Sequence, residues 1–255
     1  MRIAKDYETA NPLNYTNHSI TTVEGAGVPK NIELFCPINK TAKRDSLSGK
    51  YPVNTNKWYQ EIDDKTQIFK LFVGDSIPRN FDPKNFHSRC EVGGSGFPLR
   101  FKESDDWYMV EYTMTLNIPK SANGERLKKE MTISQLFAVG LSRPQFRLEL
   151  TPEGAIGYGS RSNGNTVLLS DKDYSDGTNP IKVKMLSNGK FFKLFLNDKQ
   201  ISFTVNGKTV DVLQTEESQK GTPNVVCQFR WGMYYNLPMY KDVTCTVADI
   251  VSKKM

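Results

Sequence analysis

The sequence predicts an all-β fold, a β-jelly-roll sandwich of two antiparallel sheets with few short helices. Segments rich in β-branched and aromatic residues follow one another from residue 107 onward. Turn formers such as "PEG", "SNGK", "LND" and "VNGK" separate them. Strands at this density, joined by short turns, are typical of two antiparallel sheets packed face to face.

Each strand is predicted from the alternation of apolar and polar residues. The first segment of this kind, 107–119, alternates along its length and ends at Pro119, which has no backbone N–H for a sheet ladder. The other segments are 130–139, 144–159, 181–186, 191–210, 225–235 and 243–251. A helix is predicted only near 122–131 or 212–220. The first 80 residues are rich in loop formers, and we expect them to wrap over the sandwich or add edge strands.

Length and charge limit the domain count and the class of partner. We predict a single domain over 1–255, with a loop-rich part over 1–80 and a motif-bearing part over 81–255. Lys and Arg number 34 against 28 Asp and Glu, a net charge of +6 that favours an anionic partner. The longest basic runs are only "LKKE" and "SKKM", so we do not expect nucleic acid as the partner.

No segment suggests a membrane span or a leader. No stretch approaches about 18 consecutive apolar residues, and the N-terminus lacks the apolar core of a secretory signal. Either the protein is made without a signal or the signal has been removed, and we expect a monomer that acts outside the cell. Cysteines Cys36, Cys90, Cys227 and Cys245 form no CxxC pair, so we expect no metal site or cofactor, and either up to two disulfides or buried thiols.

Alternation also separates core residues from residues on an open sheet face. In 228–235, Arg230 and Tyr234 lie opposite an apolar set that includes Trp231, and in 144–150, Arg147 lies on the polar side. A shallow groove lined by Arg, Gln, Tyr and His suits an anionic sugar chain, because guanidinium and amide groups complement carboxylates. The alternative is an ordinary solvated face.

The segment "NFHSRCEVGG", 85–94, places three polar residues at every second position. These residues are His87, Arg89 and Glu91, and His87 is one of only two histidines in the chain. In an extended strand all three side chains point to the same face.

Three motifs in order resemble the β-jelly-roll polysaccharide lyases, a group that includes alginate, glucuronan and type I heparin lyases. They are "RCEV" at 89–92, "ISQL" at 133–136 and "FRWGMYY" at 229–235. The resemblance runs from about residue 80 to the C-terminus. It implies a concave groove that binds an acidic polysaccharide, and β-elimination at a uronic acid that leaves 4,5-unsaturated uronate ends.

The motifs also depart from those of the alginate lyases, which typically carry Q-I-H. Phe137 stands where that histidine would be, Arg230 replaces a usual lysine, and "RCEVG" stands where R-[ST]-E-L-R is favoured. The resemblance is therefore closer to the glucuronan or heparin lyases, whose histidine comes from another strand. His87 becomes the candidate substitute.

The resemblance implies a role for each matched residue. The catalytic candidates are His87, Arg89, Gln135 and Tyr234, and the substrate-binding candidates are Glu91, Arg147, Arg230 and Tyr235. Gln135 and Arg89 would stabilise the charge that develops on the uronate carboxylate. His87 would serve as base or as a further carboxylate contact, and Tyr234 as acid or as both acid and base. Glu91 would orient Arg89 through an ion pair rather than act on substrate.

Other function classes are compatible with parts of the pattern. A noncatalytic, lectin-like carbohydrate-binding protein suits the fold, the aromatic residues and the charge equally well. A retaining glucanase needs two closely spaced carboxylates, and the nearest string, "EIDDKT" at 61–66, has Thr66 at the second position. A structural jelly-roll protein gives no reason for the Gln, Arg, His and Tyr matches.

Overall fold

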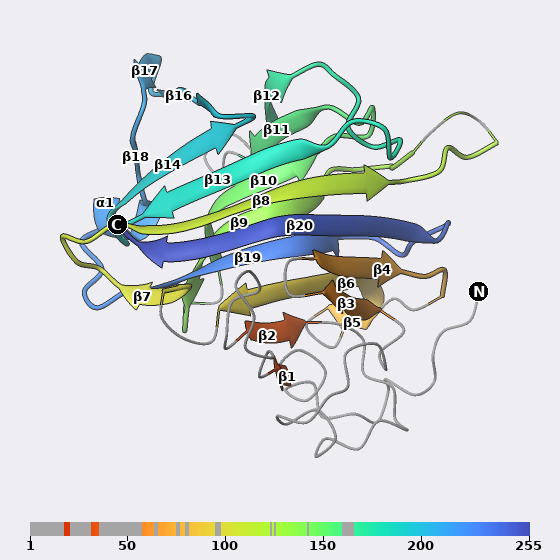
Figure 1. The fold of residues 1–255 in the computed structure, drawn as a ribbon, viewed down its shortest axis with the longest axis horizontal. Coiled ribbons are helices and arrows are strands. Elements are labelled where there is room, and N and C mark those ends of the chain that lie inside the picture. Colours follow the sequence, from red (N-terminus) through yellow and green to blue (C-terminus); the bar gives the residue numbers. More distant parts are fainter. Residues whose placement is uncertain are drawn as a thin grey trace.

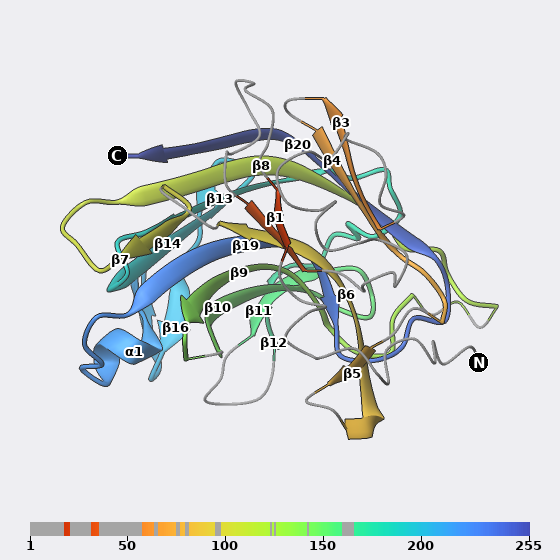
Figure 2. The ribbon, with the colours of Figure 1, turned by 90° about the horizontal axis from the view of Figure 1, so that it is seen from below.

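Two antiparallel sheets packed face to face form the body of the protein in the computed structural model (Figure 1). The structure describes residues 18–20, 32–35, 58–63, 66–74, 77–79, 82–94, 98–122, 124, 126–141, 143–159 and 166–255. Figure 2 shows the two layers from the side, with the strands of both arching in the same sense. The predicted jelly-roll sandwich is confirmed.

The larger sheet has ten strands in the order β1-β2-β6-β19-β9-β10-β11-β12, with β5 beside β6 and β7 beside β19. Its strands are β1 (His18–Ile20), β2 (Ile32–Phe35), β5 (Ile77–Arg79), β6 (Asp82–Gly94), β7 (Arg100–Lys102), β9 (Met131–Val139), β10 (Arg143–Leu150), β11 (Ile156–Gly159), β12 (Thr166–Ser170) and β19 (Val226–Tyr235). In Figure 2 the concave side of this curved sheet faces away from the smaller sheet. We call this side the outer face.

The smaller sheet has eight strands in the order β15-β14-β13-β8-β20-β4-β3, with β18 beside β14. Its strands are β3 (Tyr59–Asp63), β4 (Thr66–Leu71), β8 (Tyr108–Asn117), β13 (Ile181–Ser187), β14 (Phe191–Leu196), β15 (Lys199–Gln200), β18 (Leu213–Gln214) and β20 (Val243–Lys254). A separate hairpin consists of β16 (Phe203–Val205) and β17 (Lys208–Val210). Strands from the first 80 residues therefore extend both sheets at one edge, as predicted.

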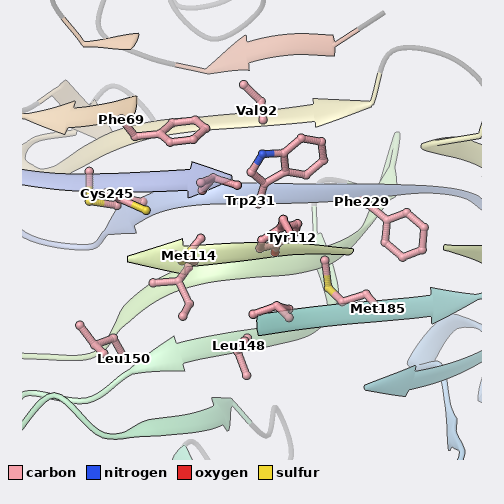
Figure 3. Close-up of a cluster of buried hydrophobic side chains, with 14 of the residues drawn as sticks. Phe69, Val92, Tyr112, Met114, Leu148, Leu150, Met185, Phe229, Trp231 and Cys245 are labelled. Carbon is pink, nitrogen blue, oxygen red and sulfur yellow. The ribbon is translucent and has the colours of Figure 1, made fainter. Parts of the chain in front are cut away.

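The core fills the space between the two sheets and follows the alternation in the sequence. Strand β13 alternates buried and half-buried residues along its whole length, and β8 does so from Val110 onward. From the larger sheet, Phe229 and Trp231 of β19 point into the core, where Tyr112 and Met185 of the smaller sheet also lie (Figure 3), and the Trp231 and Tyr112 ring centres are 5.7 Å apart. Burial of this apolar surface is the main favourable contribution to folding.

Two buried hydrogen bonds cross the sandwich from strands β19 and β9 of the larger sheet. The Trp231 indole N–H donates to the Gln67 side-chain oxygen at 2.8 Å, joining β19 to β4. The Tyr112 and Ser134 hydroxyls are 2.5 Å apart and join β8 to β9. Because a buried polar group without a partner is costly, these bonds oppose any slip of β19 and β9.

The predicted turns form where the sequence places them. Asn206 and Gly207 both have positive φ, 50° and 74°, in the two-residue turn between β16 and β17. Asn197 and Asp198 do the same, with φ of 49° and 65°, between β14 and β15. Such turns match the twist of a β-hairpin, and Asn, Asp and Gly tolerate the left-handed conformation.

A helix forms within 212–220, one of the two places where it was predicted. It is the short helix α1 (Glu216–Gln219), and the side chain of its N-cap Thr215 accepts a hydrogen bond from the Ser218 N–H. The described residues of the alternative segment, 122–131, are turns and bends leading into β9. The reason is that the Arg126 guanidinium donates to the Ile118 carbonyl and to Asp173, both at 2.9 Å, and holds this segment as a loop.

The cysteines are thiols where the structure describes them. Cys90, Cys227 and Cys245 are buried thiols, and burial raises the pKa of the Cys227 thiol to about 12. Cys36 lies outside the described residues. Among the helices described, none combines the length and apolarity that a membrane crossing needs.

A bulge in β19 depends on a glycine. Pairing of β19 with β9 shifts register between Trp231 and Tyr234, and Gly232 within this shift has a φ of 127°. A Cβ atom on Gly232 would lie 2.6 Å from both the Cys90 carbonyl oxygen and the Glu91 Cα. Glycine is therefore required by the backbone angle and by the close approach of β6.

Replacing this glycine should destabilise the fold more than replacing a glycine that only needs a positive φ. We expect Gly232→Ala to lower the free energy of unfolding by at least about 2 kcal/mol, measured by urea denaturation. The matched control is Gly207→Ala, where φ is 74° but no atom lies within 4 Å of the added Cβ, and it should lose about 1 kcal/mol. Equal losses in the two variants would contradict the close contact.

Candidate active site

Residues from three distant sequence motifs meet on the outer face. Strands β6, β19 and β9 are neighbours, and their register places Arg230 opposite both Gly93 and Gln135. Tyr234 lies opposite Arg89. Because the residues next to these in sequence point into the core, their own side chains turn outward.

The carboxylate of Glu91 is the centre of this cluster. The Arg89 Nε and Nη2 donate to Glu91 Oε1 at 2.9 and 2.5 Å, and the Gln135 Nε2 donates to Glu91 Oε2 at 2.7 Å. The Arg230 Nη1 lies 3.7 Å from Glu91 Oε1. Glu91 is only 2% exposed, so two cations and an amide compensate its removal from water.

A second chain of contacts fixes Arg230. Its Nε donates to the Gln228 side-chain oxygen at 2.6 Å, and the Gln228 Nε2 donates to the Gly94 carbonyl at 2.5 Å. The guanidinium carbon lies 3.5 Å from the centre of the Phe137 ring. Stacking on an aromatic face is a geometry that a planar guanidinium favours and a lysine ammonium does not reproduce. Phe137 and Arg230, two residues at which the motifs differ from those of alginate lyases, therefore contact each other.

Tyr234 borders the cluster and is partly exposed. The Arg89 guanidinium carbon lies 5.5 Å from the centre of the Tyr234 ring, within cation–π range. The cluster therefore combines fixed cationic donors with an accessible phenol. That set can bind a carboxylate and exchange a proton with a group beside it.

Tyr235, one of the predicted site residues, does not join this cluster. Tyr235 is completely buried and its hydroxyl accepts a hydrogen bond from the Lys128 N–H at 3.0 Å, so the prediction that it binds substrate is wrong. Alternation sends it inward because its neighbour Tyr234 points outward. His87 lies in β6 opposite Ile77, but its side chain is outside the described residues, and its role stays a prediction.

Arg147 lies on β10, opposite Gln135, and pairs with Glu149. The Arg147 Nε is 3.3 Å from Glu149 Oε1, and the Thr166 hydroxyl donates to Glu149 Oε2 at 2.7 Å. Burial raises the pKa of the Glu149 carboxyl, while Arg147 and the Thr166 hydrogen bond act against this shift. Arg147 therefore lies one strand away from the cluster, and it forms an ion pair with Glu149.

Two contact residues were not selected from the sequence. Gln228 and Glu149 both alternate onto the polar side of their strands, but neither belongs to the matched motifs. Combining alternation with strand order would have found them, because Gln228 lies opposite Phe137 and Glu149 opposite Thr132. Among the described residues, no group of three or more His, Cys, Asp or Glu side chains is placed to hold a metal ion.

The string that resembles a glucanase site lies elsewhere. Glu61 belongs to β3 at the edge of the smaller sheet and is buried, and its carboxylate accepts a hydrogen bond from the Tyr59 hydroxyl at 2.8 Å. Burial raises the pKa of Glu61. This carboxylate is not part of the outer face.

Comparison with known proteins gives a fold match without a sequence match. No protein-family model and no curated protein matches the chain. Among solved structures, alginate lyase AlgAT5 of polysaccharide lyase family 7 superposes with a TM-score of 0.57 at 12% identity, covering 88% of this chain and 94% of that one. The chain shares its fold with family 7 alginate lyases. The alginate lyase from Corynebacterium sp. gives 0.56 at 11% identity, covering 94% of this chain and 93% of the other.

A marine family 7 alginate lyase, AlyA1 from Zobellia galactanivorans, gives a TM-score of 0.54 at 12% identity, covering 94% of this chain and 96% of that chain. At such identities the likeness establishes the jelly-roll fold, and function has to be argued from the site. The predicted closer likeness to glucuronan or heparin lyases stays a prediction.

Removing the Glu91 carboxylate should lower the free energy of unfolding. Glu91→Ala leaves the charges of Arg89 and Arg230 facing each other, so we expect a loss of about 3 kcal/mol in the free energy of unfolding. The control is Glu111→Ala in β8, where Glu111 pairs with Lys182 at 3.2 Å and Lys184 at 2.6 Å on a more exposed surface. It should lose no more than about 1 kcal/mol in the same urea titration. Similar losses would show that Glu91 does not compensate a buried cluster.

The pH dependence of the free energy of unfolding should show the raised pKa of Glu149. Its folded-state pKa is raised, so the folded protein holds the proton more tightly than the unfolded chain. Wild-type stability therefore falls as pH rises from the unfolded glutamate pKa of about 4.3 through the folded value. Glu149→Gln lacks this proton, so its stability relative to wild type should increase with pH over that interval. A difference that does not vary with pH would contradict the assignment.

Proposed function

We propose that the protein is a polysaccharide lyase that cleaves an anionic, uronic-acid-containing polysaccharide by β-elimination. The observation that carries the proposal is the cluster of Arg89, Gln135 and Arg230 around Glu91, beside Tyr234. The fold match to alginate lyases supports it. Structures of one of these neighbours, alginate lyase A1-II′, hold a product and a substrate.

The chemistry needs a group that stabilises negative charge on the uronate carboxylate. Loss of the C5 proton places charge on that carboxylate, and donors fixed beforehand stabilise it without reorganising. Arg89, Gln135 and Arg230 meet this requirement because Glu91, Gln228 and Phe137 already hold them. A guanidinium carries five N–H donors, and this number exceeds what a single carboxylate oxygen accepts.

The same chemistry needs a base for the C5 proton and an acid for the departing O4. Tyr234 is our assignment for the acid, because it is partly exposed and lies beside Arg89. We assign proton removal to His87 or to Tyr234 itself, according to whether proton and leaving group lie on opposite sides or the same side of the ring. No step in this scheme requires a cofactor.

The substrate that we favour contains glucuronate, as in glucuronan or heparin-like chains, rather than alginate. Phe137 occupies the position of the alginate lyase histidine, and its ring is covered by Arg230. The carboxylate contact that a histidine would provide from β9 is thus provided here by a cation from β19.

The direct test is incubation with alginate, glucuronan, heparin-type and pectic polymers while following the ultraviolet absorbance of unsaturated uronate ends. Tyr234→Phe and His87→Ala should each lower kcat by about 100- to 10,000-fold, the range expected for lost general acid or base catalysis. Tyr174→Phe is the matched control, because Tyr174 lies outside the Glu91 cluster and its hydroxyl accepts a hydrogen bond from the Asn197 Nδ2 at 3.5 Å. It should retain full activity.

Each outcome separates the candidates. Full activity in either site variant removes that residue from the mechanism. Binding of a polymer without any rise in absorbance contradicts elimination and supports the noncatalytic carbohydrate-binding alternative.

A further inference from the structure

The smaller sheet carries a group of cations on the opposite side of the sandwich from the Glu91 cluster. We call this side the convex face, because the strands of both sheets arch in the same sense and it lies opposite the concave side of the larger sheet (Figure 2). Its middle consists of β14, β13, β8 and β20, which lie side by side (Figure 1). The residues at its centre are Trp107, Glu111, Lys182, Lys184, Lys193 and Phe195.

Two lysines on the convex face lie over aromatic rings. The Lys193 Nζ is 4.6 Å from the centre of the Trp107 ring. Lys184 is paired with Phe195 across β13 and β14, and its Nζ is 5.6 Å from the centre of that ring. Both rings are half-buried and lie outside the hydrophobic core. Because cation–π attraction holds each ammonium group above a ring, these two charges occupy defined positions on the surface.

Lysines outnumber carboxylates on the four central strands. The carboxylates of β8, β13, β14 and β20 are Glu111 and Asp249. The lysines of the same strands are Lys182, Lys184, Lys193, Lys253 and Lys254. One of them, Lys254, contacts Asp106 just before β8 at 2.5 Å. The excess of positive charge complements a partner of negative charge.

The lysines differ in how far protein carboxylates already engage them. Lys182 and Lys184 share Glu111, at 3.2 and 2.6 Å, and Lys182 also contacts Asp198 at 2.8 Å. In the part of the chain that the structure describes, Lys193 forms no ion pair and contacts a ring instead. An incoming carboxylate therefore reaches Lys193 without displacing a carboxylate of the protein.

The type of cation and the curvature indicate which anion suits this face. The four central strands contain lysine but no arginine, whose planar fork suits a single oriented phosphate or carboxylate. Lysine is a point charge, and several lysines attract a chain of repeated anionic groups without fixing one orientation. A flat membrane meets only the crest of a convex surface, and a second copy of the same face brings like charges together. A flexible acidic polysaccharide meets neither obstacle.

We propose that the convex face is a second, noncatalytic binding surface for an acidic polysaccharide. The inference rests on the proposed function for the class of polymer, but it requires no cleavage. A chain long enough to reach both faces binds the second one at a raised effective concentration. The convex face should therefore matter for long polymers and not for short oligosaccharides.

The test measures how glucuronan slows the migration of the protein in native electrophoresis gels at low ionic strength. All proteins in this test carry Tyr234→Phe, so that cleavage does not shorten the polymer. Lys184→Gln combined with Lys193→Gln should raise the dissociation constant for glucuronan about tenfold, because both positioned charges are lost. Gels that contain an uncharged glucan should slow none of these proteins.

Two control pairs separate the convex face from net charge. Lys172→Gln with Lys208→Gln removes the same charge outside the four central strands, and the Lys172 Nζ likewise lies over a ring, 5.6 Å from the centre of Tyr174. This pair should change the dissociation constant less than about twofold. Lys184→Arg with Lys193→Arg keeps both charges and should bind as the parent protein does.

The outcomes distinguish this inference from the proposed function. With Tyr234 intact, the glutamine pair on the convex face should cleave a glucuronate tetramer at the wild-type rate and lose efficiency only on long glucuronan. Equal weakening by the two glutamine pairs, or unchanged migration of the parent protein in glucuronan gels, would overturn the inference. The expected binding pattern in a protein that cleaves no polymer would support the convex face and contradict the lyase.

Discussion

The buried carboxylate of Glu91 is the constraint on which the architecture of the outer face depends. At 2% exposure it requires compensating donors, and these come from its own strand β6, from the neighbouring β19 and from β9 beyond it. Arg89, Gln135 and Arg230 can meet it only in one register of β6, β19 and β9. From the core side, Trp231 and its hydrogen bond to the smaller sheet hold the same register. One electrostatic requirement and one packing requirement thus specify the same arrangement.

Alternation and motif order were enough to predict the sandwich, the polar face and the meeting of Arg89, Gln135, Arg230 and Tyr234. They were not enough to assign Tyr235, because the motif spans both tyrosines and only strand direction separates the outward ring from the buried one. The contact between the guanidinium and the Phe137 ring was also hidden, since it joins residues far apart in sequence and depends on pairing between two strands.

The described part of 122–131, the alternative place for the predicted helix, is not helical for a similar reason. Its residues have helical propensity, but hydrogen bonds from Arg126 to a distant carbonyl and carboxylate outweigh that weak preference. Glu149 shows the complementary limit. Its polarity was visible in the sequence, whereas its burial beneath Gly159 depends on how β11 lies against β10.

The central claim is that donors organised around Glu91 serve an elimination at a uronate. The most direct measurement is mass spectrometry of fragments released from a glucuronate-containing polymer in heavy-oxygen water. Elimination forms an unsaturated end by loss of the leaving chain, so the account predicts fragments whose new non-reducing ends are unsaturated and whose other new ends carry no solvent oxygen from the cleavage step. Saturated new ends with solvent oxygen incorporated at cleavage would indicate hydrolysis and would contradict the account.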